Sequence, residues 1–465
     1  MRRIFTSETV LKAGETVKVA GWIHARRDMG KVIFFDLRDK DGLLQIVAVP
    51  SDLGEEGYAV ASSLRSEWVV EIEGVVQTRS AKQVNNKIIT GTVELLAKNI
   101  KVLNEAKTPP FELDKDTFGI GEDSRMKYKY LDLRTERMAK NLRMRNSIFQ
   151  YMRGFLDKEQ FVEVETPMLT KGTPEGAREF MVPSRLHEGT FYVLPQSPQQ
   201  FKQLLMVAGV ERYYQMARCF RDEDQRGDRQ PEFTQMDLEM SFVEQEDVMD
   251  VIERLLIETV ETLYPNKKIQ EKPFPRISYA EAMKKYGTDR PDIRADKNDP
   301  NLLAFCWVVD FPFFEKGGDG HWTFTHNPFS APKPDQMQEL LNKENIGEII
   351  TTQYDICLNG FEIGGGSIRN HRPEALKSVL EIIGHSEKQI NDQFGHMLKA
   401  FEYGAPPHGG IAFGMDRIVA ILQNEPNIRE VIVFPKDGNA RDHMMDAPSA
   451  MPSTALQDVH IKLDI

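Results

Sequence analysis

Short runs of alternating apolar and polar residues fill the first quarter of the chain. Between residues 16 and 104 they read TVKVAGWIH, KVIFFDLRD, LLQIVAVP, WVVEIEGVVQTR, KIITGTVELLA and NIKVLN. Gly, Asp and Asn residues separate these runs, as expected of turns between strands. Five or six closely spaced strands predict a small β-barrel of the oligonucleotide-binding type (OB-fold), which we assign to residues 1–106.

The remainder of the chain alternates between strand and helix patterns. Thr108-Pro109-Pro110 ends the barrel, and the polar stretch 107–136 is expected to be a hinge. The pattern then predicts strands at 161–166, 191–194, 212–220, 233–243, 304–310, 349–356 and 360–363. Helices are expected from Arg137 and at 199–208, 244–263, 335–342, 373–383, 386–402 and 414–422. Antiparallel strands with flanking helices indicate an α+β multidomain protein whose second domain spans 137–465.

Composition narrows the class of protein. The 465 residues suffice for two or three domains, and no apolar run reaches the ~18 residues that a membrane helix needs. The N-terminal sequence lacks the apolar core of a secretory signal, so we expect a cytoplasmic protein without a membrane partner. The three cysteines, Cys219, Cys306 and Cys357, are too far apart for a disulfide framework or a cysteine-based zinc site.

Charge bears on a nucleic-acid partner. A net charge of −12 argues against a nucleic-acid partner, because the neutralisation of phosphates by Lys and Arg supplies most of the affinity of a protein for nucleic acid. The segment 125–145 is nonetheless basic, with eight Lys or Arg against two acids and with Tyr128 and Tyr130 interleaved. This composition suits either a groove along a sugar-phosphate backbone or a solvated helix face.

One hairpin carries a phosphate-binding pattern. Residues 218–242 read RCFRDEDQRGDRQPEFTQMDLEMSF, in which a strand ends near Phe220 and another begins at Phe233. Arg221 would be fixed at the strand end, where its planar guanidinium could grip a phosphate or carboxylate. The alternative is an exposed hairpin held by surface ion pairs.

Two further segments combine glycines with charged residues. Asp355 and Glu362 flank the turn Leu358-Asn359-Gly360, and such a carboxylate pair could hold Mg²⁺ with substrate phosphates or lie on a solvated sheet face. Three glycines then precede Arg369 and permit a ligand to approach the backbone closely. Near the C-terminus, HGGIAFGMDR places a glycine-rich strand before a helix whose first turn carries Arg417.

Together these segments resemble the three motifs of class II aminoacyl-tRNA synthetases. Pro167 corresponds to motif 1, Phe220 to Glu223 to motif 2, and Gly414 to Arg417 to motif 3. Five further segments resemble the bacterial type of aspartyl-tRNA synthetases, and the resemblance extends over nearly the whole chain. These segments are TPEGAREF, LPQSPQQFKQLLM, RQPEFTQMD, NGFEIGGGSIR and HGGIAFGMDR. The resemblance implies an AMP-forming ligase that activates L-aspartate with ATP and Mg²⁺ and charges tRNA(Asp).

The same resemblance implies site residues. Those for ATP are Arg221, Asp222, Glu223, Gln230, Phe233, Glu362, Gly414, Met415, Asp416 and Arg417, with Arg221 also the catalytic residue. Those for aspartate are Glu175, Gln199, Gln200, Phe201, Lys202, Arg221, Asp237, His326 and Arg369. Asp355 and Glu362 would hold the metal, and Arg27, Phe34 and Gln45 would bind the tRNA anticodon. Phe34 and Phe35 have opposite strand parity, so one should face the barrel core and the other the outside.

The sequence departs from the family in two places. Only residues 289–301 occupy the position of the domain-sized insertion between motifs 2 and 3, so we expect a short exposed linker there. Asn327 follows His326 where bacterial relatives commonly have a second His. The alternatives left open are an enzyme that also charges tRNA(Asn) and a catalytically silent RNA-binding paralogue. Motif 1 implies a homodimer.

Overall fold

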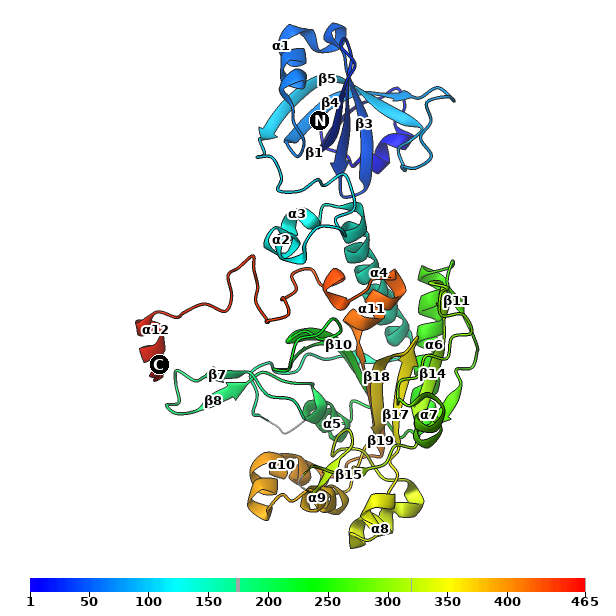
Figure 1. Ribbon diagram of the computed structural model, residues 1–465, viewed down its shortest axis with the longest axis vertical. Helices are drawn as coiled ribbons and strands as arrows, with labels where there is room; N and C mark the ends of the chain where they lie inside the picture. Colours follow the sequence, from blue (N-terminus) through cyan, green and yellow to red (C-terminus); the bar gives the residue numbers. More distant parts are fainter. Residues whose placement is uncertain (173–175, 319, 465) are drawn as a thin grey trace. The chain divides into compact units, whose positions relative to one another are not determined.

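The computed structural model describes residues 1–172, 176–318 and 320–464. These residues form two compact units, Met1–Arg137 and Met138–Ile465, each with its own hydrophobic core. Figure 1 shows the helices and strands of both units along the chain. The first unit includes the whole 107–136 segment, in which Phe111, Leu113 and Met126 are buried.

The first unit is built on a closed barrel. Its strands pair in the order β1-β2-β3-β5-β4, and residues such as Val19, Phe35 and Ile72 fill the interior. The helices and strands of this unit are η1 (Thr6–Leu11), β1 (Thr16–Asp28), β2 (Ile33–Asp39), β3 (Gly42–Ala48), α1 (Pro50–Ser63), β4 (Val69–Thr78), β5 (Val93–Asn104), α2 (Glu122–Lys127) and α3 (Lys129–Asp132). The predicted OB-fold barrel is therefore confirmed, with five strands.

Two local expectations in this unit were incomplete. The last two apolar runs form one strand, β5, because a register shift opposite Glu73 and Gly74 absorbs the irregularity that resembled a turn. Helix α1 was not predicted, since its serines and its Gly54 with a φ of 69° obscure a helical pattern. Its buried Ala61 packs into the barrel core, so tertiary contacts outweigh the weak local propensity.

The second unit is built on an eight-stranded sheet among the described residues. The order is β12-β14-β17-β18-β19-β10-β9-β6, antiparallel except at its two edge pairs, β12–β14 and β6–β9. Its strands are β6 (Val162–Glu163), β9 (Arg212–Phe220), β10 (Glu232–Ser241), β12 (Arg276–Ser278), β14 (Phe305–Val309), β17 (Gln353–Leu358), β18 (Phe361–Ile368) and β19 (His408–Gly414). The antiparallel α+β domain expected from the sequence is thus confirmed.

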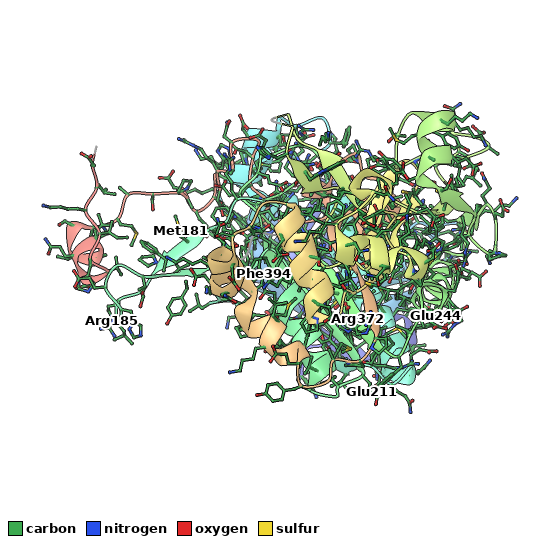
Figure 2. All side chains as sticks on the ribbon, turned by 90° about the horizontal axis from the view of Figure 1, so that it is seen from below. Met181, Arg185, Glu211, Glu244, Arg372 and Phe394 are labelled. Atoms are coloured by element: carbon green, nitrogen blue, oxygen red, sulfur yellow. The ribbon has the colours of Figure 1, made fainter. Side chains whose placement is uncertain are left out.

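Helices flank this sheet, and short ribbons extend from it. The helices are α4 (Glu136–Lys158), α5 (Gln199–Val207), α6 (Gln245–Leu263), α7 (Tyr279–Tyr286), α8 (Met337–Asn342), α9 (Pro373–Ile382), α10 (Glu387–Phe401), α11 (Met415–Gln423) and α12 (Ser453–Asp458), with 3-10 turns η2 (Pro334–Gln336), η3 (Ile346–Glu348) and η4 (Ile428–Glu430). The small ribbons are β7 (Met181–Pro183) with β8 (Phe191–Val193), β11 (Lys268–Ile269) with β13 (Leu302–Leu303), and β15 (Phe314–Lys316) with β16 (Trp322–Phe324). Figure 2 shows Met181 and Arg185 on the β7–β8 ribbon, which extends outward, whereas Phe394 lies on α10.

Strand parity gives the sheet one apolar face and one polar face. On β10, Met236, Leu238 and Met240 lie in the main hydrophobic core with residues of α4, α6 and α11. The intervening Phe233, Gln235 and Asp237 line a cavity on the other face. Successive side chains of a strand point to opposite faces, so one strand supplies both the core and the site.

Glycines keep the polar face open. A Cβ on Gly410 would lie 2.1 Å from the carbonyl oxygen of Leu238 and 2.2 Å from Glu239 Oε2. A Cβ on Gly365 would lie 2.6 Å from Asp355 Oδ1. Any larger residue would therefore displace the strands or the acidic side chains, which explains the glycine-rich sequence of β18 and β19.

The segment 289–301 contains neither helix nor strand, and it differs in part from the expected exposed linker. Residues 295–298 are exposed, but Pro291 is buried and Ile293 packs on a small core with Cys306 and Cys357.

Among the described residues, no helix is long and apolar enough to cross a membrane.

Candidate active site

A cavity of about 650 Å³ opens on the polar face of the sheet. Its walls come from α5, the β9–β10 hairpin, β17, β18, β19 and the start of α11. Fourteen of the residues implied by the resemblance line it, namely Gln199, Lys202, Arg221, Glu223, Gln230, Phe233, Asp237, His326, Asp355, Glu362, Arg369, Gly414, Asp416 and Arg417. Residues up to 218 positions apart in sequence thus meet in one hollow.

Arg221 lies where the β9–β10 hairpin opens. Its backbone N–H donates to the carbonyl of Pro231 at 2.9 Å, which extends the strand pairing by one residue. Its guanidinium carbon lies 5.2 Å from the ring centre of Phe233. This cation–π contact holds the arginine above the ring, with the fork facing the cavity.

The hairpin loop is anchored at its base. Gln230 donates to the carbonyl of Lys436 at 3.0 Å and accepts from the Lys436 backbone N–H at 2.8 Å. Arg229 donates to Glu223 Oε2 at 3.1 Å, and the carbonyl of Gly227 accepts from the Ile428 N–H. These contacts position the loop above the cavity.

Helix α11 fixes the opposite wall. Asp416 accepts from Arg145 at 2.5 Å and from the backbone N–H of Thr234 at 3.1 Å, so it joins α11 to α4 and β10. Arg417 donates to the carbonyl of Glu362 and lies 3.4 Å from Asp228 Oδ2. Asp416 therefore has a structural role, while Arg417 spans from the sheet to the hairpin loop.

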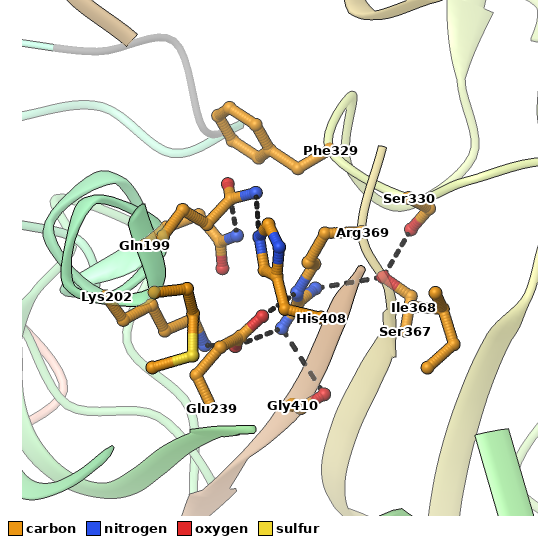
Figure 3. A network of polar contacts seen from close by, with 12 residues as sticks. Gln199, Lys202, Glu239, Phe329, Ser330, Ser367, Ile368, Arg369, His408 and Gly410 are labelled. Carbon is orange, nitrogen blue, oxygen red and sulfur yellow. Dashed lines mark hydrogen bonds and ion pairs between the residues drawn. The ribbon is translucent and has the colours of Figure 1, made fainter. Parts of the chain in front are cut away.

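Three residues of the cavity wall, Lys202, Asp237 and Arg369, belong to a cluster of four buried charges. Lys202 Nζ lies 2.6 Å from Asp237 Oδ1 and 3.2 Å from Glu239 Oε2. Arg369 donates to both oxygens of Glu239, from Nε at 2.8 Å and from NH2 at 3.2 Å. Figure 3 shows Glu239 lying between the lysine and the arginine. All four side chains are at most 4% exposed.

Glu239 was missed by the sequence reasoning. The only signal for it was parity, since Asp237 and Glu239 alternate with the apolar Met236, Leu238 and Met240 on one strand. The structure gives both cations of the cluster acidic partners, because Lys202 pairs with Asp237 and Arg369 pairs with Glu239.

The two acids of the cluster differ in their proton affinity. Burial acts to raise the pKa of Glu239, but Arg369 and Lys202 outweigh it and lower the pKa to about 2. Burial raises the pKa of Asp237, and Lys202 offsets this only in part. Glu239 is therefore a fixed anion. Asp237 lines the cavity, and its Oδ2 is buried.

His408 lies next to this charge cluster, and its imidazole is neutral. Its Nδ1 lies 2.7 Å from the carbonyl of Pro406, and its Nε2 lies 3.0 Å from Gln203 Nε2. The carbonyl requires Nδ1 to donate, so Nε2 accepts from the amide. Burial, the largest effect, lowers the pKa of His408 to about 4. Its backbone carbonyl accepts from the N–H of Arg369 at 2.8 Å, which helps to place that arginine.

Asp355 and Glu362 form the acidic part of the cavity. Burial, followed by the charge of Glu362, raises the pKa of Asp355 well above its usual range. Gln353 donates to Asp355 Oδ1 at 2.6 Å, and Asn327 donates to Gln353 Oε1 at 3.4 Å. Asn327 stands where bacterial relatives commonly have a second His, and its hydrogen bond connects its loop to β17. Burial lowers the pKa of the adjacent His326, whose ring packs edge-on against Phe311.

Some implied residues do not line the cavity. Met415 is fully buried in the main core, and Asp222 is exposed with its backbone paired to Arg178. Gln200 and Phe201 lie on α5 but are absent from the cavity wall. Glu175 lies outside the described residues.

The three residues implied for the anticodon lie together on the barrel. Arg27 is directly opposite Phe34 in the β1–β2 pairing, and its guanidinium lies 3.2 Å from Gln45 Oε1. Phe34 is half-buried, whereas Phe35 is fully buried in the core, as their opposite parity predicts.

The basic run 125–145 is largely committed to ion pairs. Arg125 and Lys129 are buried against Asp132, and Arg134 lies 2.8 Å from Glu67. Arg145 is bound to Asp416. Both readings of this run were therefore incomplete, because several of its cations are structural.

The fold and the cavity define the class of protein. The family model "tRNA synthetases class II (D, K and N)" matches residues 121–438, and "OB-fold nucleic acid binding domain" matches residues 17–103. An "Aspartate--tRNA(Asp/Asn) ligase" of Rubrobacter xylanophilus is 40% identical, with 97% of this chain and 95% of that protein covered. An "Aspartate--tRNA ligase" of Staphylococcus saprophyticus is 38% identical, with 98% of each covered. The chain belongs to the bacterial-type aspartyl-tRNA synthetases, within class II.

The alignments agree with the missing insertion. The alignment with the Rubrobacter protein covers 575 positions and this chain has 465 residues, so at least 110 positions have no counterpart here.

Solved structures support the fold. An asparaginyl-tRNA synthetase from Pyrococcus horikoshii with asparaginyl-adenylate gives a TM-score of 0.75 at 22% identity, over 94% of this chain and 98% of that one. An aspartyl-tRNA synthetase from Entamoeba histolytica gives 0.73 at 22% identity, over 94% and 92%.

The low pKa of His408 predicts a pH-dependent stability. The folded protein keeps this imidazole neutral while the unfolded chain takes up a proton below pH 6.5, so stability falls as the pH decreases from 6.5 towards 4. The contribution reaches about 1.4 kcal/mol per pH unit in this window. In His408→Gln, the dependence of the unfolding free energy on pH should be shallower, as measured by urea denaturation at several pH values. An unchanged slope would contradict the assignment.

Proposed function

We propose that this chain activates L-aspartate with ATP to form aspartyl-adenylate and transfers the aspartyl group to the 3′ end of tRNA(Asp). The observation that carries the proposal is the buried Lys202, Asp237, Glu239 and Arg369 cluster beside Arg221 and Phe233 in one cavity. Both the matched family and the names of the relatives support this function.

Charge balance in the cluster favours aspartate over asparagine. We assign Asp237 to the substrate ammonium, because it is the acid of this cluster that lines the cavity. The two positive charges of Lys202 and Arg369 then exceed the negative charge of Glu239 by one. The side-chain carboxylate of aspartate neutralises this remaining positive charge. The neutral amide of asparagine would leave that charge buried and uncompensated, which is costly.

Adenylate formation requires positioning and no general base. The α-carboxylate of aspartate is already ionised at neutral pH, so it can attack the α-phosphorus directly and displace pyrophosphate. We assign Arg221 to the α-phosphate, where its guanidinium would meet the charge that develops in the transition state. Phe233 and Arg417 would hold the adenine between them, and the anchored loop with Glu223 would hold the rest of the nucleotide.

Asp355 and Glu362 fit a magnesium site. The two carboxylates interact strongly enough for the charge of Glu362 to raise the pKa of Asp355. Two carboxylates together with substrate phosphates are the donor set that Mg²⁺ prefers, and the described residues contain no larger metal-binding group. When bound, the ion would neutralise the triphosphate and order it for in-line attack.

The role of Arg221 can be tested without tRNA. We expect Arg221→Ala to reduce aspartate-dependent pyrophosphate exchange by about 10²- to 10³-fold, the range found for loss of one transition-state donor. Arg218→Ala is the matched control, because Arg218 lies on β9 just before Arg221 and pairs with Glu232 outside the cavity. Equal losses in the two variants would contradict the role assigned to Arg221.

The barrel residues should affect tRNA use alone. Loss of a stacked base costs about 1–3 kcal/mol, so Phe34→Ala should lower kcat/KM for tRNA(Asp) about tenfold and leave pyrophosphate exchange unchanged. The Rubrobacter relative is named as a ligase for both tRNA(Asp) and tRNA(Asn). Aminoacylation assays with both tRNAs would show whether this chain is also non-discriminating. A loss of exchange in Phe34→Ala would contradict the division of labour.

We further propose that the chain forms a homodimer through its motif 1 region. The edge strand β6 and the segment after it leave Val162 and Leu169 more than half exposed. Such apolar exposure at a sheet edge suits a second copy. Light scattering at micromolar concentration should give twice the mass of the chain, and a monomer would contradict the proposal.

A further inference from the structure

A row of buried polar side chains lies between the charge cluster and the acidic part of the active-site cavity. Arg369 NH1 donates to Ser367 Oγ at 2.9 Å, and the hydroxyl oxygens of Ser367 and Ser330 lie 2.9 Å apart. Ser330 Oγ lies 3.3 Å from Gln353 Oε1, and Gln353 Nε2 donates to Asp355 Oδ1 at 2.6 Å. Figure 3 shows the contacts of Ser367 with Arg369 and with Ser330. This polar row therefore runs from a guanidinium to a carboxylate.

The hydrogens of the polar row can all point the same way. Arg369 only donates hydrogen bonds, whereas the Gln353 amide oxygen and an ionised Asp355 only accept them. Ser367 accepts from Arg369, so its own hydrogen points to Ser330, its other side-chain partner among the described residues. The hydrogen of Ser330 is then left for the amide oxygen of Gln353. Each bond in such a series polarises the next, which strengthens the link between the cation and the anion.

The backbone fixes the place of the two serines. Ser330 forms a β-bridge with Arg369, and the N–H of Ala331 donates to the carbonyl of Ile368 at 2.8 Å. Ser330 and Ser367 are at most 1% exposed. Neither serine is among the described residues that line the cavity. The two hydroxyls can therefore act on a ligand only through the side chains that they contact.

We propose that Ser330 and Gln353 are positioning residues that hold Arg369 and Asp355 at a fixed separation. Arg369 belongs to the subsite proposed for aspartate, and Asp355 belongs to the carboxylate pair that fits magnesium. Adenylate formation needs the α-carboxylate of aspartate in line with the α-phosphorus, so the placement of one substrate relative to the other matters. The proposal rests on the proposed function, because that function assigns ligands to both ends of the polar row.

Two variants interrupt the polar row at different points. Ser330→Ala removes the central hydroxyl, and Gln353→Met removes the amide while it keeps a side chain of similar length. The matched control is Ser378→Ala, which removes another buried hydroxyl, one that donates to the carbonyl of Glu374 within α9 and lies outside the cavity. Urea denaturation measures the stability of each variant. The two single variants give independent results, so either one decides the question when the other does not fold.

Binding is measured separately at the two ends of the polar row. Isothermal titration calorimetry gives the Kd of L-aspartate without nucleotide. Electron paramagnetic resonance of free Mn²⁺ gives the Kd of this metal with α,β-methylene-ATP, which cannot form the adenylate. We expect Ser330→Ala to weaken the binding of aspartate and of Mn²⁺ by about three- to tenfold each, as for the loss of one buried hydrogen bond. The control should bind both as wild type does.

The double variant distinguishes one connected row from two separate local effects. Either substitution already interrupts the row, so Ser330→Ala with Gln353→Met should weaken aspartate binding no more than the more damaging single substitution does. Multiplied losses in the double variant would overturn the inference. So would a Ser330→Ala protein that binds both ligands normally, or one that is impaired for a single ligand.

The wild-type protein separates this inference from the proposed function. Normal binding of aspartate and Mn²⁺ by wild type and by both single variants would refute the positioning role and leave the proposed function intact. Wild-type protein that binds neither aspartate nor Mn²⁺ with the nucleotide would refute the proposed function, and the positioning role with it.

Discussion

The site depends on one buried carboxylate, that of Glu239, held between Lys202 and Arg369. Burying an ion costs several kcal/mol, and the cost is offset only when its partners are close and fully hydrogen-bonded. Glu239 meets this condition by taking two hydrogen bonds from one guanidinium and an ion pair from the lysine. Because the cations come from α5 and from the end of β18, the carboxylate fixes these two elements relative to β10.

The sheet makes this arrangement possible. On strand β10, Met236 and Leu238 point into the core, whereas Asp237 and Glu239 lie on the opposite face with the buried cations. The packing that stabilises the unit therefore also positions these charges. Gly410 on the neighbouring strand leaves room for Glu239, because a Cβ there would overlap the carboxylate. The buried charge cluster thus depends on close strand approach as well as on the charged side chains themselves.

Local signals predicted much of the structure. Strand β9 spans Arg212–Phe220 as expected from its alternation, and the helix pattern from residue 199 corresponds to α5. Prediction was poorer where contacts outweigh local preference. Helix α1 has weak helical propensity but packs on the barrel, and several cations of the 125–145 run, such as Arg125, are buried by acids that sequence spacing alone did not identify.

By itself the sequence determined the fold class, the order of the three motifs and most of the charged residues that line the active-site cavity. The fold class follows from periodicity, and the site residues follow from short motifs that resemble those of a known family. Only the tertiary structure decided that Glu239 balances Arg369, that Met415 belongs to the core, and that Ser330, Ser367 and Gln353 lie between Arg369 and Asp355. Those relations join segments far apart in the chain, and they are set by strand register and burial, which no local pattern records.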